Sequence, residues 1–477
     1  MLNSLKLLLL LLLCTHLQAN ETYSVDEFID YLTNTHSKPK ILKSQVLASE
    51  FSFNKTNALT DWKINTSIAT AHTEPYQSSS FSTSFIDTNQ LDFSISRPIL
   101  TTGGALTFRH SQQKISQSPI EFGGVSLSES QYFQNMLSVS YTQPLLYGFL
   151  GESLDFPIHV ASTNVKVSTI QSKEALETFL VTELSTYIDW ALSNELTELS
   201  FSRFQLARES YNQTKDRVKV NLSEKIDLLR AESALERAHQ LWLTQKAKLK
   251  SMQFKLSSRI GDQTILLKSP RFDLYDTVYI KKPSYIITNR LRVVKSITLN
   301  KNVLKKQLAL SESKRNGQLN LIGSYDLLGG DTAFQSAQAY NNNNSSIVLQ
   351  YTRALSDTES IAAVKQETEQ IQQIEYEEEQ LLIDLESEIL SMYTLIDEYK
   401  NILNTTLNQI IIAQQQAKAE EDLYKQGRSS LDMLIQSQDN VLNSKLAYAN
   451  LSATYQKYVL AYQALTDELL NAYGVTL

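Results

Sequence analysis

The sequence predicts a mainly α-helical fold with a smaller β component, built from long antiparallel helical hairpins and short groups of strands. Glycine and proline are scarce, at 13 and 8 of 477 residues, which favours long helices over a loop-rich fold. Glycine is absent from about Ser153 to Val218, and neither glycine nor proline occurs from about Thr358 to Tyr424. At about 1.5 Å per residue, helices of this length reach about 100 Å.

An internal repeat is the second observation behind this fold class. Leu137–Leu145 resembles Ile347–Leu355, and further along the chain Leu228–Glu232 matches Leu434–Gln438. The two offsets differ by only a few residues. The chain is therefore expected to be a duplicated unit, each copy consisting of strands followed by a helical hairpin, with terminal and linking helices added.

The N-terminus predicts a secretory signal peptide over residues 1–19. Lys6 precedes an unbroken leucine run, Leu7–Leu13, and Ala19 is a small residue suited to cleavage. The run is too short to span a bilayer as a helix. The only cysteine, Cys14, offers lipidation as an alternative, although the bulky leucine before it disfavours that modification. If Cys14 leaves with the signal, the mature chain has no thiol for a disulfide or a metal.

Segments of period-two alternation follow, and each has one polar face. They centre on Ile64, Val139, Leu321 and Leu349, the four strands expected from the two halves. Alternation of this kind is the weak signature of a transmembrane barrel strand. Two further alternating runs within Leu91–His110 flank a Thr-Thr-Gly-Gly turn. We expect them to form an extra hairpin that extends an extracellular loop.

The remaining segments are expected to be helical. The return helices place apolar residues three and four positions apart, from Leu228 to Leu256 and from Tyr448 to Leu469, which indicates coiled-coil packing. The order of segments is then 1–19 signal peptide, 20–60 N-terminal helix, 61–147 first strand pair with the inserted hairpin, 148–262 first long helical hairpin, 263–317 linking helices, 318–355 second strand pair, and 356–477 second long helical hairpin with the C-terminal end.

Each helical hairpin is expected to reverse in a tight turn. Asn221 and Gly427 occupy matching positions in the two copies of the repeat. Both residue types adopt a left-handed backbone conformation at low cost. A helix-start pattern follows each turn, Asn221 with Glu224 and Ser429 with Asp432.

With these elements in order, the chain resembles the TolC-like outer-membrane efflux and export channels. The residues that carry the resemblance are Tyr141–Gly148, where a strand turns into a helix at a proline, Tyr424–Ser430, and the closing segment from Leu434 to Gly474. The resemblance implies an outer-membrane conduit that extends into the periplasm. It also implies a homotrimer in which four strands per chain form a 12-stranded barrel in contact with outer-membrane lipid. The partners it implies are a periplasmic membrane-fusion adaptor and an inner-membrane pump or ABC transporter, in an efflux or type I secretion system.

The resemblance also implies a gate at the tips of the hairpins. Asp227 and Tyr424 match a carboxylate and a phenol that are hydrogen-bonded in the family's closed state, and Arg428 lies one place from the matching arginine. Asp432 is close to positions where family members carry aspartates, although the matching residues here, Met433 and Gln436, are not acidic. With the turn residues Asn221 and Gly427, these form the expected gate.

No catalytic, cofactor-binding or metal-binding motif is found. The six histidines are scattered, and the paired glycines lack the lysine and hydroxyl of a phosphate loop. The net charge of -7 gives no reason to expect binding of nucleic acid, which requires a clustered basic face. Between Asp357 and Glu388 there are eleven acids and one base, Lys365, which indicates either a solvated helix face or an acidic channel lining. The alternative function is a periplasmic or surface coiled-coil scaffold without a pore.

Overall fold

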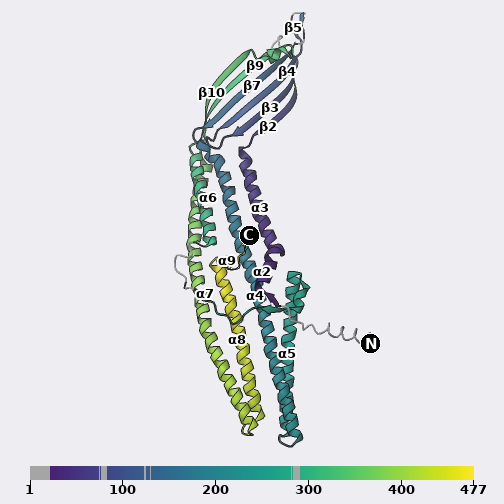
Figure 1. Cartoon of the computed structure of the whole chain (residues 1–477). Helices are drawn as coiled ribbons and strands as arrows, with labels where there is room; N and C mark the ends of the chain where they lie inside the picture. The colour runs from purple at the N-terminus through teal and green to yellow at the C-terminus, as the bar shows by residue number, and fades with distance from the viewer. Residues whose placement is uncertain are drawn as a thin grey trace, which may run out of the picture. The chain divides into compact units, whose positions relative to one another are not determined.

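The computed structural model describes residues 22–476, apart from 75, 77–82, 123–124, 129, 281 and 283–289 (Figure 1). The signal-peptide prediction, including Cys14, lies outside these residues. The chain divides into two units, which we describe separately. One contains Met1–Gln45, Ile170–Lys295 and Gln380–Leu477, and the other Val46–Thr169 and Ser296–Glu379.

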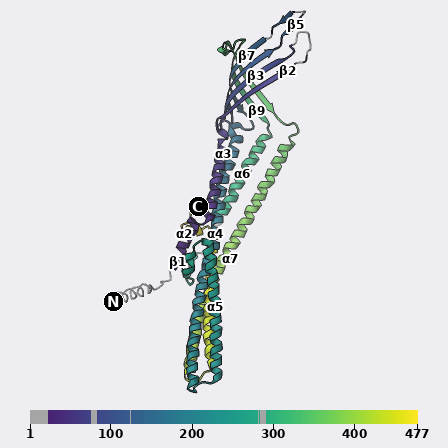
Figure 2. The same ribbon diagram turned by 90° about the vertical axis from the view of Figure 1, so that its right-hand side faces the viewer.

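The second unit contains a six-stranded antiparallel sheet in the order β10-β9-β7-β4-β3-β2, whose strands lie side by side in Figures 1 and 2. A separate two-stranded ladder, β5 (Ile120–Phe122) and β6 (Val125–Leu127), lies between β4 and β7 in the sequence. The strands of the large sheet are β2 (Lys63–Thr73), β3 (Ile86–Pro98), β4 (Ala105–Gln117), β7 (Ser130–Pro144), β9 (Gln318–Asp331) and β10 (Asn342–Thr352).

The expectation of four strands per chain is wrong, because the inserted hairpin is part of the sheet. β3 pairs with β2 over the full length of β2, and β4 pairs with β7 from Ala105↔Thr142 to Gln117↔Ser130. The hairpin is therefore not an extension of an extracellular loop. Period-two alternation identifies a strand but carries no information about its neighbours, so the sequence left the position of this hairpin open.

The two faces of the sheet differ in polarity. One row in register across all six strands consists of polar residues only: Asn65, Ser94, Arg109, Ser138, Asp326 and Asn344. The adjacent row, on the opposite face, is apolar except at its last residue: Ile64, Ile95, Phe108, Val139, Tyr325 and Ser345. We call these the polar face and the apolar face. In these two rows the alternation expected for the individual strands is thus in register across all six strands.

The turn between β3 and β4 packs against the segment that joins β7 to the first long helix. The backbone φ angles of Gly103, Gly148 and Gly151 are +72°, +85° and +81°, and a Cβ on Gly103 would lie 2.1 Å from the carbonyl oxygen of Gly148. Gln143 Nε2 donates to the carbonyl oxygen of Thr102 at 2.7 Å. Glycine is required here because both the backbone conformation and the close approach exclude a side chain.

The long helices are α4 (Glu152–Lys219), which is continuous across Pro157, and α7 (Thr358–Lys425), each 68 residues long. Each is followed by a shorter return helix, α5 (Lys225–Ile260) or α8 (Leu431–Leu465). The residues before the sheet form two helices, α2 (Val25–Asn34) and α3 (Ser37–Asn57), and the linking segment contains one long helix, α6 (Arg292–Lys314). The short elements are α9 (Leu469–Ala472) and the 3-10 turns η1 (Ala58–Thr60), η2 (Phe149–Gly151), η3 (Gln263–Leu267) and η5 (Ser336–Ala339).

The core of the first unit brings together segments that are distant in the sequence. β1 (Thr22–Ser24) pairs in parallel with β8 (Ser269–Arg271). Beside this ladder, a buried cluster includes Phe28, Trp190, Leu256 and Leu469. A second cluster packs α7 against α8 and includes Ile396 and Tyr455. Because these side chains leave water on folding, they supply the main stabilisation of this unit.

The fold class predicted from the sequence, mainly α with a β component and long antiparallel helical hairpins, is confirmed. Within the described ranges, none of the helices combines the length and the apolar character that crossing a membrane requires.

Candidate functional site: the tip turns and two charge networks

The two tip turns have the same backbone geometry. Asn221 and Gly427 have positive φ angles of 60° and 70°, as the sequence predicted for these positions. In the first turn the N–H groups of Asn221 and Leu222 donate to the carbonyl oxygens of Val218 and Arg217. This pair of bonds defines a Schellman motif, which satisfies the last carbonyls of a helix.

The second tip repeats this arrangement. The N–H groups of Gly427 and Arg428 donate to the carbonyl oxygens of Tyr424 and Leu423, at 3.0 and 2.9 Å. The side chain of Arg428 is exposed. The two halves of the repeat thus use different residue types, asparagine and glycine, for one backbone conformation.

The predicted helix starts are displaced from Asn221 and Ser429. Glu224 caps α5, with Asp227 as its reciprocal partner, and Ser430 caps α8 by accepting from the backbone N–H of Met433 at 3.3 Å. Asn221 cannot be a cap, because its left-handed backbone is incompatible with the extended conformation that a helix cap needs. Ser429 instead donates to a carboxylate oxygen of Glu420 at 2.5 Å.

Within one chain, the structure does not bring Asp227 and Tyr424 together. Asp227 accepts at 3.4 Å from the backbone N–H of Glu224 and at 3.4 Å from Nη1 of Arg230. The phenol oxygen of Tyr424 is buried and has no hydrogen-bond partner among the described residues. The guanidinium of Arg217 lies over the Tyr424 ring, 4.9 Å from its centroid, a distance at which a cation is attracted to the ring face.

Sequence reasoning missed the contact that links the two tips. Arg230 Nε lies 3.4 Å from Asp432 Oδ2, while Nη1 of the same side chain contacts Asp227. Arg230 and Asp432 are both well exposed, at 42% and 61% of the side chain, so the pair contributes at most about 1 kcal/mol. Arg230, six residues after the Glu224 cap position, gave no sign of this role, because its partner lies about 200 residues away.

Behind the tips, small and branched apolar residues pack the two hairpins together. Ala231 and Ala234 of α5 lie against Leu431, Leu434 and Ile435 of α8, and all five are buried. Small residues on one helix permit close approach of the other. The tips are thus held by packing beneath a weak ion pair.

The acidic run is a helix–helix contact over much of its length. Lysines of α6, and Arg315 just after it, face four of its acids, and neutral polar side chains of α6 face a fifth. The pairs are Lys301–Glu378, Lys305–Glu375 at 3.6 Å, Lys314–Glu359 at 2.9 Å and Arg315–Asp357 at 3.7 Å, and the buried Glu367 accepts from Gln307 and Ser311. The side chains of Glu359 and Glu375 stay 86% and 49% exposed, in agreement with a solvated face, whereas Glu367 and Glu378 are largely buried against α6, which neither interpretation made from the sequence expected.

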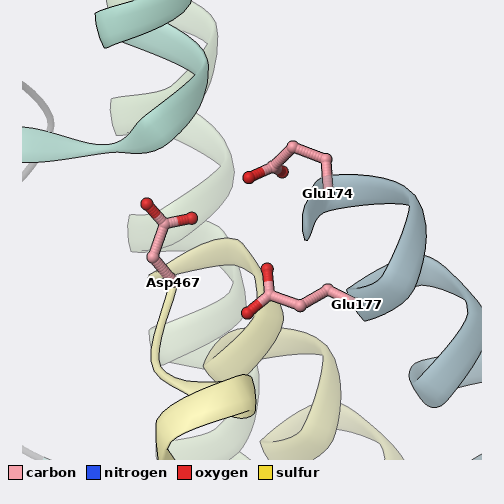
Figure 3. Close-up of side chains that lie close together, drawn as sticks. All are labelled: Glu174, Glu177 and Asp467. Atoms are coloured by element: carbon pink, nitrogen blue, oxygen red, sulfur yellow. The ribbon is translucent and has the colours of Figure 1, made fainter. Parts of the chain in front are cut away.

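A second network lies where α4, the start of α6 and the turn after α8 meet (Figure 3). Arg292 Nε lies 2.9 Å from Glu174 Oε1, and Nη2 contacts both Glu177 and Asp467, the latter at 3.1 Å. The backbone N–H of Arg292 donates to Asp467 at 2.7 Å, and Glu177 also accepts from the N–H of Leu470. Figure 3 shows the three carboxylates converging on one space from two elements.

Burial dominates the protonation of this network. Desolvation raises the pKa of Glu177 to about 7, and it also raises the pKa of Glu174, although Arg292 opposes both shifts. Among the described residues, Glu174, Glu177 and Asp467 form the one group of carboxylates spaced to hold a metal ion, with ligand atoms within 4.8 Å of one another. The Arg292 guanidinium already supplies the positive charge in this space, so the network is a structural clamp between three elements.

Comparison with known proteins identifies the fold. No protein-family model matches the sequence, and no curated protein matches it by sequence. Solved structures do match. They include the outer membrane protein VceC of Vibrio cholerae (TM-score 0.64, 10% identity, 94% of this chain and 96% of that one) and the CmeC outer membrane channel of Campylobacter jejuni (0.64, 13%, 92% and 85%). The open-state MtrE outer membrane channel of Neisseria gonorrhoeae also matches (0.63, 12%, 93% and 89%). The resemblance drawn from the sequence is confirmed at the level of the fold: the chain has the fold of the TolC-like outer-membrane channels.

Proposed function

We propose that this chain is the subunit of an outer-membrane channel, a passive conduit from the periplasm to the exterior for small molecules, peptides or proteins. The sheet carries the proposal. One face is apolar and exposed, with Ile68 at 81% and Ile347 at 82%. The other carries serine, asparagine, Asp326 and an ion pair between Arg109 and Asp92 at 2.7 Å. An apolar outer band and a polar interior are what a sheet needs in order to separate lipid from water.

The unpaired edges of the sheet support a homotrimer. β2 and β10 are both eleven residues long, and every residue in both is exposed. An unpaired edge in lipid leaves backbone groups unsatisfied at several kcal/mol each, so each edge needs a neighbouring strand. Large apolar residues are also exposed along α7, at Ile383, Leu390 and Ile412, as expected of surface covered by another copy.

The alternative of a pore-free scaffold does not need such a sheet. Fractionation of membranes and light scattering of the protein in mild detergent test the proposal. We expect the protein in the outer-membrane fraction and a single species with the mass of three chains, which conducts ions in planar bilayers. A monodisperse monomer, or a trimer without conductance after its tips are loosened, would contradict it.

We further propose that the tips form the gate of this channel. Asp227, Tyr424 and Asp432 lie around the two turns, and Arg230 is the group that joins one tip to the other. A contact worth at most about 1 kcal/mol biases a closed state weakly, which suits a gate that a partner must open. The turn residues Asn221 and Gly427 and the exposed Arg428 give the tips their shape.

Substitution of Arg230 tests the gate. We expect Arg230→Ala to raise single-channel conductance, because α5 is then linked to α8 at the tip by apolar packing alone. Arg237→Ala is the matched control. Arg237 lies two turns along the same helix, and among the described residues its side chain is hydrogen-bonded only to Ser233 of that helix. Equal conductance in the two variants and the wild type would assign closure to other contacts.

The phenol of Tyr424 gives a separate test. Among the described residues of one chain the phenol has no hydrogen-bond partner, so Tyr424→Phe is expected to leave the stability of the isolated chain unchanged or slightly raised. If the phenol bonds to another copy in the trimer, the same substitution raises conductance. The expected latch between Asp227 and Tyr424 would then act between chains.

The proposed partners are a periplasmic membrane-fusion adaptor and an inner-membrane pump or ABC transporter, which would supply the energy that a passive conduit lacks. Crosslinking in cells followed by mass spectrometry identifies them. Recovery of a drug pump or of a secretion ATPase would also separate efflux from type I secretion. Recovery of neither, with the trimer intact, would refute this assignment of partners.

A further inference from the structure

We infer that three copies of this chain close an 18-stranded wall, and that the β3–β4 hairpin makes the outer part of the conduit wide enough for macromolecular cargo. The inference rests on the proposed trimeric channel. It departs from the 12 strands expected from the sequence, because each chain contributes six strands instead of four.

The hairpin is built into the wall and is not an appendage. Both of its strands are thirteen residues long, against eleven for β2 and β10, and they pair with β2 on one side and β7 on the other. Its turn is anchored on β7 and on the segment that joins β7 to α4: the close approach of Gly103 to Gly148 is accompanied by a 2.9 Å hydrogen bond between the Thr102 and Tyr141 hydroxyls. The turn end of the hairpin is therefore fixed.

The directions of the edge strands and the polarity of the two faces of the sheet allow neighbouring copies to join edge to edge. All neighbouring strands in the sheet are antiparallel, so with six strands β10 of one copy runs opposite to β2 of the next. Antiparallel pairing is the arrangement of natural barrels of this kind. The polar row that starts at Asn65 on β2 ends at Asn344 on β10, so pairing of the two edges continues both faces without interruption.

The number of strands fixes the width of a closed sheet. With strands about 4.8 Å apart and tilted by about 40°, a 12-stranded barrel has a backbone diameter of about 24 Å and an 18-stranded barrel one of about 36 Å. The cross-section at the backbone grows about 2.2-fold. Natural barrels of 16 to 18 strands leave an aqueous channel after their side chains are placed.

The lining suits cargo that is large and varied. The polar face carries small neutral side chains such as Ser94, Ser138 and Ser324. Its Arg109–Asp92 pair is internally neutralised, and its Asp326 accepts a hydrogen bond from Ser138. Small side chains leave the width available, and the absence of a single-sign charge pattern in this part of the described sheet gives little selection between cations and anions. Width, and not charge, then determines what passes this part of the conduit.

Cysteine pairs test the position of the hairpin in the trimer, in a Cys14→Ser background. We expect a disulfide between Asn65→Cys and Ser94→Cys, and another between Thr107→Cys and Ser140→Cys, since both pairs are partners in the register. Asn65→Cys with Ser138→Cys is the matched control. It should not crosslink, because three strand spacings separate the two by about 14 Å. A disulfide in the control pair, and none in the other two, would place β2 beside β7 and overturn the inference.

Closure between copies is tested in the same way. Asn344→Cys is combined in turn with a cysteine at every second position from Lys63 to Ala71. At least one combination is expected to give a covalent ladder ending at the trimer. A trimer that yields no ladder with any combination would show that β10 and β2 of neighbouring copies are not paired.

Deletion of residues 86–117 tests the width itself. Ser118 donates its backbone N–H to the carbonyl oxygen of Phe85 at 3.1 Å, so the deletion joins ends that already lie together, and β2 can then pair with the antiparallel β7. We measure the size of polyethylene glycol that enters from the side of the β9–β10 loop and lowers single-channel conductance. The wild type is expected to admit polymers with a hydrodynamic radius about 1.5 times larger than the variant admits.

The outcomes are distinguishable. A wild-type protein that is no trimer or conducts no ions refutes the proposed function. A conducting wild-type trimer with the same polymer limit as a folded deletion variant refutes only the 18-stranded wall. If the deletion variant does not fold, the cysteine pairs decide alone.

Discussion

Glu177 allows the sharpest prediction, because it is nearly fully buried and contacts a single cation. Its burial raises its pKa from the usual 4.5 to about 7, and a shift of this size corresponds to about 3 kcal/mol between the two protonation states. The folded chain therefore keeps a proton on Glu177 between pH 4.5 and 7, where the unfolded chain has released it. Stability from this group is fully present below about pH 4.5 and is lost as the pH rises through 7.

The substitution Glu177→Gln should remove this dependence. Glutamine has nearly the same volume, stays neutral at every pH, and keeps an acceptor for the Arg292 guanidinium. We expect the unfolding temperature of the wild type to fall between pH 5 and pH 8, and that of the variant to fall much less. Some dependence should remain, because the pKa of Glu174 is raised as well.

Circular dichroism at four pH values between 5 and 8 is a sufficient measurement. Glu198→Gln on the same helix is the control. Glu198 is exposed, and among the described residues its side chain is hydrogen-bonded only to Asn194 one turn away; the pH dependence of this variant should match that of the wild type. A wild type equally stable at pH 5 and pH 8, or a Glu177→Gln variant with an undiminished fall, would show that Glu177 is ionised in the folded chain at pH 5.

Two further predictions use matched pairs. Gly103→Ala should destabilise the protein by more than about 2 kcal/mol, because a Cβ there would lie 2.1 Å from a carbonyl oxygen, whereas Gly427→Ala, with a similar φ and open space, should cost about 1 kcal/mol; equal shifts in thermal unfolding would argue against the tight junction. Lys301→Ala should lower the free energy of unfolding by about 1–3 kcal/mol, because it leaves the largely buried Glu378 without its cation. Lys305 is exposed, so Lys305→Ala should lower it by less than about 0.5 kcal/mol. Urea unfolding of the two lysine variants measures the difference, and a reversed order would contradict the burial of the first pair.

The features that depend on local sequence were predictable. Helix length follows from the rarity of glycine and proline, and α4 and α7 begin and end within one residue of the limits expected for them. The left-handed turns at Asn221 and Gly427 follow from the backbone preferences of those two residue types, supported by their matching places in the repeat. Local rules were insufficient for the helix starts that follow these turns: the sequence predicted them at Asn221 and Ser429, and the structure has Glu224 and Ser430 as the N-caps.

Features that depend on distant partners were not predictable. The acids of α7 are identical in a sequence whether they face water or lysines, and only the fold places α6 beside them. Arg292 likewise gathers carboxylates that lie 115 and 175 residues away. The position of the inserted hairpin belongs to the same class, because strand pairing is decided by contacts of high sequence separation.

The antiparallel order of the sheet has a consequence for how such proteins diverge. β2 and β7 run in opposite directions with or without a hairpin between them, so adding or losing one hairpin leaves the direction of every other strand unchanged. A single added strand would reverse all that follow and bring the helices to the wrong end. The perimeter of this sheet can therefore change during evolution only by even increments, and any rotational symmetry multiplies each increment by the number of subunits.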